Sequence, residues 1–154
     1  MKGCSVLKPE FIIVADSREQ APYFWPRTPC IRAALPAGDY SVQGLETRVA
    51  IERKSLIDAY GTFGRGRDRF ERELAKLAEL DFAAVVIEAS MLEALTRPPP
   101  KVQKFTPKHF NRAVVAWSQR FGVHFWYCDC RALAQRQTYI LLERFWRDVI
   151  DGKR

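Results

Sequence analysis

The chain has 154 residues and a formal net charge of +7. This length suits a single compact domain, which can bury a sizeable core without disulfide bridges. No apolar run is long enough to cross a membrane, and the first residues lack the apolar stretch of a signal peptide. We therefore expect a cytoplasmic protein without membrane contact. The positive charge suits a partner such as DNA, although many basic proteins bind no nucleic acid.

Strand-like runs dominate the first third of the chain. Residues 11–15 are apolar up to Asp16, and residues 48–54 form another run of strand length. Two shorter runs, 31–35 and 39–43, flank a Pro-Ala-Gly turn. We expect a strand from each of these four segments.

Helical spacing alternates with strands in the rest of the chain. The pattern of apolar residues predicts helices over 56–60, 67–80, 107–121 and 131–150, and strands over 81–88 and 123–128. Thr106 and Asp129 stand where helix N-caps are expected. Residues 82–87 are apolar without interruption, which is typical of a strand in a parallel sheet covered on both faces. The order of elements indicates an α/β domain with a mixed central sheet flanked by helices.

A group of charged residues stands at the end of the run 48–54. Residues two apart on a strand point to the same face, so Glu52 and Lys54 should project together. A hairpin with the run that starts at Asp39 would bring a second carboxylate beside them. Two carboxylates and one ammonium group would then share a site.

This combination suits the hydrolysis of a phosphodiester. That reaction needs a hard divalent cation and a source of hydroxide near neutral pH. Carboxylate oxygens bind Mg²⁺, and Lys54 would orient the attacking water or neutralise the charge that develops at phosphorus. The alternative is an ordinary solvated charge cluster, because a Glu-x-Lys spacing alone is common. The metal site is favoured because three charged motifs follow one another within about forty residues. They are Asp16-Ser17-Arg18-Glu19, Gly38-Asp39-Tyr40 and Glu52-Arg53-Lys54 with Asp58.

These motifs resemble the nuclease domain of the XPF-type structure-specific endonucleases, whose signature is GDx(n)ERKxxxD on a restriction-endonuclease-like, PD-(D/E)xK core. The resemblance runs from about Phe11 to the end of the chain, after a tail over residues 1–10. It implies that Mg²⁺ or Mn²⁺ is held by Asp16, Asp39 and Glu52, with Lys54 as an active-site lysine. It also implies that further polar residues support the metal site or the phosphate, namely Arg18, Glu19, Arg53 and Asp58.

The chain departs from the family pattern between Glu19 and Asp39. Larger relatives carry a helix there, whereas this chain has a proline-punctuated segment over residues 20–37 that cannot form a regular helix. We expect an extended arm in its place. The three consecutive aromatic residues 23–25 either pack this arm onto the core, which we favour, or stack on unpaired bases.

A glycine-rich loop over residues 61–67 lacks the Lys-Ser/Thr ending of a P-loop, so nucleotide binding is not expected. Arginines crowd the start of the following helix and oppose its dipole, which makes sense if they help to hold a phosphate. A solvated basic face is the alternative. We expect DNA contacts at Arg18, Arg65, Arg67 and Arg69, and the resemblance favours Arg67 in particular.

The resemblance implies a metal-dependent endonuclease acting on branched, flap or junction DNA in repair, recombination or phage DNA processing. The chain has no room for the helix-hairpin-helix or helicase domains that relatives append. We therefore expect a free-standing nuclease of bacterial or phage origin, or one part of an assembly that grips DNA through another chain. The alternative is a noncatalytic DNA-binding or scaffolding module, against which the intact Asp39, Glu52 and Lys54 argue.

The last helix carries a broad apolar surface. Most of it should be core, but the remainder suits pairing with a second copy or with a DNA-binding partner chain. We expect this contact at Phe145, Trp146, Val149 and Ile150.

Overall fold

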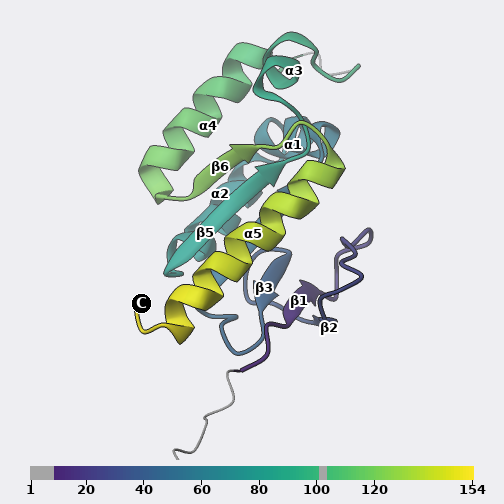
Figure 1. Cartoon of the computed structure of the whole chain (residues 1–154). Coiled ribbons are helices and arrows are strands. Elements are labelled where there is room, and N and C mark those ends of the chain that lie inside the picture. The colour runs from purple at the N-terminus through teal and green to yellow at the C-terminus, as the bar shows by residue number, and fades with distance from the viewer. Residues whose placement is uncertain (1–8, 101–103) are drawn as a thin grey trace, which may run out of the picture.

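The computed structural model describes residues 9–100 and 104–154, so most of the expected N-terminal tail lies outside the described residues. The described residues form a six-stranded sheet between layers of helices (Figure 1). The strands are β1 (Ile13–Asp16), β2 (Cys30–Ala33), β3 (Tyr40–Val42), β4 (Val49–Lys54), β5 (Phe82–Ile87) and β6 (His124–Tyr127). The helices are α1 (Leu56–Phe63), α2 (Arg67–Ala78), α3 (Met91–Thr96), α4 (Pro107–Phe121) and α5 (Arg131–Ile150).

The sheet is mixed, with the strand order β2-β1-β3-β4-β5-β6. β3 pairs antiparallel with β4, as the predicted hairpin requires, with Tyr40 opposite Ile51. β5 pairs in parallel with both β4 and β6, which confirms the prediction from its unbroken apolar run. The strand that ends in the Glu-Arg-Lys motif therefore lies inside the sheet, where both neighbours fix its position.

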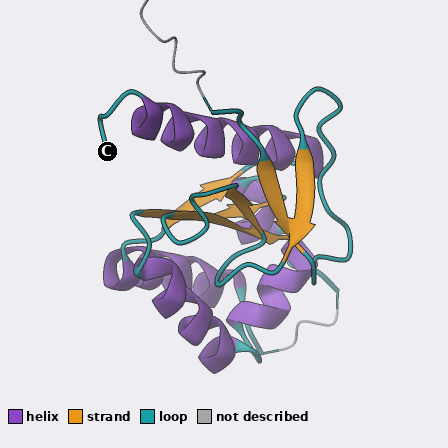
Figure 2. Cartoon of the chain, turned by 90° about the horizontal axis from the view of Figure 1, so that it is seen from below, coloured by secondary structure: helices purple, strands orange, loops and turns teal. Residues whose placement is uncertain are grey.

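Side chains on β4 alternate between two hydrophobic layers. Ala50 packs in the layer under α1 to α4, whereas Ile51 packs in the layer that faces α5. Figure 2 shows α5 alone on one side of the sheet and the other helices on the opposite side. The same alternation sends Glu52 and Lys54 toward α1 and α2, and Arg53 toward the opposite face.

The segment over residues 20–37 is extended and contains no helix, as expected. β2, within it, adds to the sheet in parallel beside β1. Tyr23 and Trp25 are buried and surround Tyr40, with the Tyr23 and Tyr40 rings stacked at 5.0 Å between centroids. Phe24 between them is 73% exposed. The prediction that this arm packs onto the core is therefore confirmed for two of its three aromatic residues.

Two local features differ from the sequence-based expectations. The helix α3, which was not predicted, begins where the Ser90 side chain accepts a hydrogen bond from the Glu93 amide. Its six residues are too few to show a helical period. Asp129 was expected to cap α5, but Cys130 is the N-cap and makes no side-chain hydrogen bond. Asp129 instead has a φ of 57°, a left-handed conformation at the turn from β6 into α5.

The apolar surface expected to bind a partner is largely internal. Phe145 is 3% exposed, and Trp146 and Val149 pack against the same core layer. The Trp146 ring lies 5.4 Å from that of Phe11. The prediction of a partner contact is therefore wrong for Phe145, which α5 uses to cover the sheet, whereas a contact at the half-buried Trp146, Val149 and Ile150 stays a prediction. No helix among the described residues is long and apolar enough to span a bilayer.

Gly38 offers a test of how tightly the turn before Asp39 is held. Its φ is +73°, and an added Cβ would lie 2.9 Å from Ala50 Cβ, whereas Gly44 has a φ of +81° and open space around it. Gly44→Ala should lower the free energy of unfolding by about 1 to 2 kcal/mol, because of the left-handed backbone alone. Gly38→Ala should lower the free energy of unfolding by about 1 to 3 kcal/mol more than Gly44→Ala, because the added methyl group overpacks the contact with Ala50, as measured by urea unfolding. Equal losses would contradict the close approach to β4.

Candidate active site

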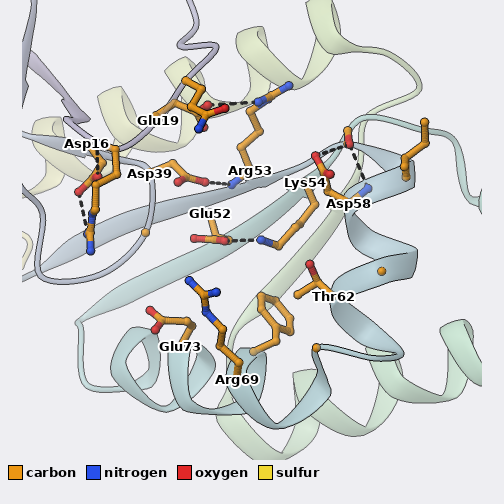
Figure 3. A pocket seen from close by; sticks show the side chains of 18 of the residues that line it. Asp16, Glu19, Asp39, Glu52, Arg53, Lys54, Asp58, Thr62, Arg69 and Glu73 are labelled. Carbon is orange, nitrogen blue, oxygen red and sulfur yellow. Dashed lines mark hydrogen bonds and ion pairs between the residues drawn. The ribbon is translucent and has the colours of Figure 1, made fainter.

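A cavity of about 1110 Å³ opens beside the end of β4. The start of the arm, the end of β4, the helix α1 and the first turns of α2 form its walls (Figure 3). Every site residue predicted from the sequence lines this cavity except Arg67. The lining residues that were predicted are Asp16, Arg18, Glu19, Asp39, Glu52, Arg53, Lys54, Asp58, Arg65 and Arg69.

Two carboxylates and a lysine meet at the floor of the cavity. Lys54 Nζ donates to Glu52 Oε1 at 2.6 Å, and the Arg53 main-chain N–H donates to Asp39 Oδ2 at 2.7 Å. Burial and the nearby charge of Glu52 raise the pKa of Asp39 to about 8. The two carboxylates are therefore close enough to repel each other, which a divalent cation between them would relieve.

Lys54 is held in its charged form by its neighbours. Burial alone would lower the pKa of Lys54, but the charge and hydrogen bond of Glu52 outweigh burial and raise it. The ammonium group also lies 5.2 Å from the centroid of the Phe70 ring, within the range of a cation–π contact. Lys54 is thus fixed between a carboxylate and an aromatic face, pointing into the cavity (Figure 3).

Asp58 fixes the start of α1 directly after Lys54. Ser55 Oγ accepts from the Asp58 main-chain N–H at 3.1 Å and donates to Asp58 Oδ2 at 2.6 Å. Ser55 is therefore the N-cap of α1, and the Asp58 carboxylate lies in its first turn, where the helix dipole favours a negative charge. This capping pair accounts for the position of Asp58 at the cavity wall.

Asp16 has its oxygens engaged by other groups. Its carboxylate accepts three hydrogen bonds from Arg18, at 2.8 to 2.9 Å, and one from the Leu35 amide at 2.8 Å. The hydrogen bond from the Arg18 side chain is the main cause that lowers the pKa of Asp16 to about 2. Asp16 therefore ties the end of the arm to β1, and Arg18 would have to move before Asp16 could bind a metal.

The donor set fits a hydrated cation held by two carboxylates. Within residues 9–100 and 104–154, no three His, Cys, Asp or Glu residues are arranged to hold a metal ion. Asp39 and Glu52 nevertheless line the same cavity close enough to interact electrostatically, and Mg²⁺ commonly keeps several waters while binding one or two carboxylates. The residues present fit such an ion. In this arrangement Asp16 is not one of its ligands, because Arg18 and Leu35 occupy its oxygens.

Arg53 points away from Glu52 and belongs to a second network. Its Nε and Nη2 donate to the two oxygens of Glu88 at 2.6 and 3.1 Å, and its Nη1 lies 3.5 Å from Glu19 Oε1. Glu88 also accepts from Tyr23 Oη at 2.8 Å and lies 3.4 Å from Arg131 Nη1. The network thus joins β4, β5, the arm and the start of α5.

Glu88 was not among the residues predicted from the sequence. Burial raises its pKa, but the hydrogen bonds from Arg53 and Tyr23 outweigh burial, so that the pKa lies below its usual value. A signal was present, because Glu88 is a carboxylate directly after the apolar strand β5, beside the end of β4. Its importance depends on Arg53 pointing to that side, which the motif alone does not reveal.

The arginines of the basic loop divide between two environments. Arg65 and Arg69 line the cavity, and Figure 3 shows Arg69 and Glu73 across from Glu52. Arg67 does not line it. Its Nε donates to Glu71 at 3.2 Å, and its guanidinium lies 5.0 Å from the centroid of the Trp117 ring. Thr62 and Glu73 also line the cavity and were not predicted, because they share no motif with the carboxylates.

Residues 15–141 match the family model described as the ERCC4 domain. The chain belongs to the ERCC4 domain family. This membership confirms the XPF-type resemblance drawn from the motifs. No curated protein matches the chain by sequence.

Solved structures that share this fold include two of XPF. XPF from Aeropyrum pernix matches with a TM-score of 0.68 at 18% sequence identity, over 92% of this chain and 68% of that one. A structure of XPF from the same organism in complex with DNA matches with a TM-score of 0.64 at 19% identity, over 93% of this chain and 66% of that one. The chain therefore spans about two thirds of each relative, and the mixed sheet flanked by helices is confirmed.

The Glu88 network can be tested by removing one carboxylate. Arg53 and Glu88 have side chains that are 14% and 8% exposed, so Glu88→Ala leaves the Arg53 charge largely out of water with only the 3.5 Å contact to Glu19. The free energy of unfolding should fall by about 3 to 5 kcal/mol. The control is Glu143→Ala, which removes an exposed pair with Arg147 and should cost under about 1 kcal/mol. Similar urea midpoints for both variants would show that the buried pair is not a structural anchor.

Proposed function

We propose that this protein is a metal-dependent DNA endonuclease that hydrolyses phosphodiester bonds in branched, flap or junction DNA. The main support is the joining of Asp39, Glu52 and Lys54 at the floor of one cavity. The family membership and the DNA complex of the similar XPF structure agree with DNA as the substrate. Repair, recombination or phage DNA processing are the processes that such cleavage serves.

Each residue has a role that follows from its position. Asp39 and Glu52 would hold Mg²⁺ or Mn²⁺, which supplies a hydroxide nucleophile near neutral pH and charge stabilisation at the phosphate. Lys54 keeps its proton beside Glu52 and can therefore orient the attacking water or stabilise the developing negative charge. Arg65 and Arg69, on the opposite wall, can bind the phosphates on either side of the scissile bond.

The proposal is tested by incubating the purified chain with flap, fork, Holliday-junction and linear DNA in Mg²⁺, Mn²⁺ or EDTA. Cleavage of a branched substrate should require a divalent ion and should exceed cleavage of linear DNA. Binding of these substrates without cleavage in either metal would support the second candidate, a noncatalytic DNA-binding or scaffolding module.

The proposed metal ligands and Lys54 should respond differently to substitution. Asp39→Asn and Glu52→Gln keep the side-chain shape but remove a ligand charge, so both should lose cleavage and Mn²⁺ binding. Lys54→Met should lose at least about a hundredfold in rate and keep Mn²⁺ binding, because an ammonium group is not a ligand. Calorimetric titration with Mn²⁺ and a cleavage assay check this, with circular dichroism as the control for folding. Mn²⁺ binding that is lost only in Lys54→Met would reverse these roles.

The arginines that line the cavity should contribute to phosphate binding. Arg69→Ala should weaken binding to all DNA sequences alike and reduce the slope of log K against log salt by about 0.9, as expected for one lost phosphate contact. Arg67→Ala is the matched control, because Arg67 is already engaged by Glu71 and Trp117. A slope that changes only in Arg67→Ala would restore the expectation drawn from the family resemblance.

We further propose that two copies of the chain pair, because a specific DNA interface covers about 1,000 to 2,500 Å² and this domain is small. The support is a groove beside the edge strand β6 that combines polar residues with three exposed apolar ones. Trp126, Leu133 and Ile140 line it and are each more than 40% exposed. Trp126→Glu should convert a dimer into a folded monomer in light scattering, whereas Leu92→Glu on α3 should not. An unmutated chain that is monomeric and fully active on junction DNA would exclude both a second copy and a partner chain.

A further inference from the structure

The arm that carries Phe24 begins at one wall of the cavity. The aromatic residues on either side of it, Tyr23 and Trp25, are 3% and 9% exposed, whereas Phe24 is 73% exposed. An exposed phenylalanine ring has no polar group that gains from contact with water. Its place in the chain therefore has no explanation in the packing of the core.

The main chain around Phe24 is fixed by hydrogen bonds from two other parts of the fold. Gln135 Nε2 on α5 donates to the Phe24 carbonyl at 2.6 Å. Arg131 Nη2 donates to the Ala21 carbonyl at 2.7 Å, and the Tyr23 amide donates to Tyr40 Oη at 2.8 Å. The backbone is thus held before and at Phe24, so its ring is presented outward from a rigid support.

The ring lies close to the cavity. Gln20 and Ala21 line the cavity wall, and Phe24 is the third residue after Ala21. Three residues span at most about 10 Å even when the chain is fully extended. The Phe24 main chain therefore lies no more than about 10 Å from the cavity wall at Ala21, on the side where the arm begins.

The charge of the arm suits a nucleic acid. Residues 20–37 contain Arg27 and Arg32 and no acidic residue. Arg27 is exposed and stands in the turn closed by the hydrogen bond from the Thr28 amide to the Trp25 carbonyl. An exposed aromatic ring on a segment that carries arginines is the combination that binds single strands without reading their sequence.

We propose that Phe24 forms a stacking site for an unpaired nucleobase of the DNA strand that leaves the cavity. This inference rests on the proposed function and adds that the bound substrate carries unpaired nucleotides on the arm side of the site. The ring can stack on any base, because every base has a π-face and phenylalanine offers no hydrogen bonds that would select one. Bases inside a duplex are excluded, since their faces are already covered by their neighbours.

The test measures equilibrium binding by fluorescence anisotropy in EDTA, so that no DNA is cut. The ligands are an oligothymidylate, an abasic strand of equal length and a blunt duplex. Phe24→Ala should weaken binding of the oligothymidylate about tenfold and leave the abasic strand and the duplex unchanged. Phe24→Trp should keep the affinity of the unmutated chain. Leu92→Ala, which truncates an equally exposed apolar side chain on α3, is the matched control and should change nothing.

Equal losses for the strands with and without bases would overturn the proposal, as would an unchanged affinity for all three ligands. A change from dimer to monomer in Phe24→Ala would assign the ring to self-association and would overturn it too. The proposed function is judged separately by cleavage of flap DNA in Mg²⁺ or Mn²⁺. If the chain does not cleave DNA but Phe24→Ala still shows the base-dependent loss, the stacking site stands and the nuclease function falls. If the chain cleaves DNA and that loss is absent, the nuclease function stands and the stacking site falls.

Discussion

The pleat of β4 is the constraint on which the site depends. Because neighbouring residues on a strand face opposite ways, Glu52 and Lys54 point into the cavity while Arg53 points to the other side. The Arg53 main-chain amide then holds Asp39 in place. Three consecutive residues thus serve two faces of one sheet, and a shift of one residue in the pairing of β4 would exchange them.

The network around Glu88 connects β4 with the arm, which has no helix, and with the start of α5. Through Tyr23 and Arg131 it ties the arm and the first turn of α5 to the end of β5. The arm has few elements of its own to support it, so its position beside the cavity depends on these side chains. Charged groups with little exposure are stable here because each one is paired and hydrogen-bonded.

Much of the fold was predictable from the sequence because its elements have clear periods. The long helix α4 begins at a Thr-Pro pair and ends at Gly122, and the central strands are continuous apolar runs. The charged motifs also predicted which residues line the cavity. The directions in which side chains point were harder to predict. Arg67 points to Trp117 and Asp16 binds Arg18, and these partners are known only once the chain is folded or the turn is closed. The burial of Phe145 was missed for a similar reason, because helical spacing cannot say how much of an apolar stripe the sheet covers.

The two outer edges of the sheet have different properties. β2 and β6 both have four residues, but β2 follows directly after Pro29 and carries Arg32, two features that discourage another strand from joining there. β6 instead carries the exposed Trp126 beside a groove. An added strand is therefore disfavoured at the edge made by the arm, whereas β6 contains neither a proline nor an arginine. The arm thus also makes the two edges of the sheet chemically unlike.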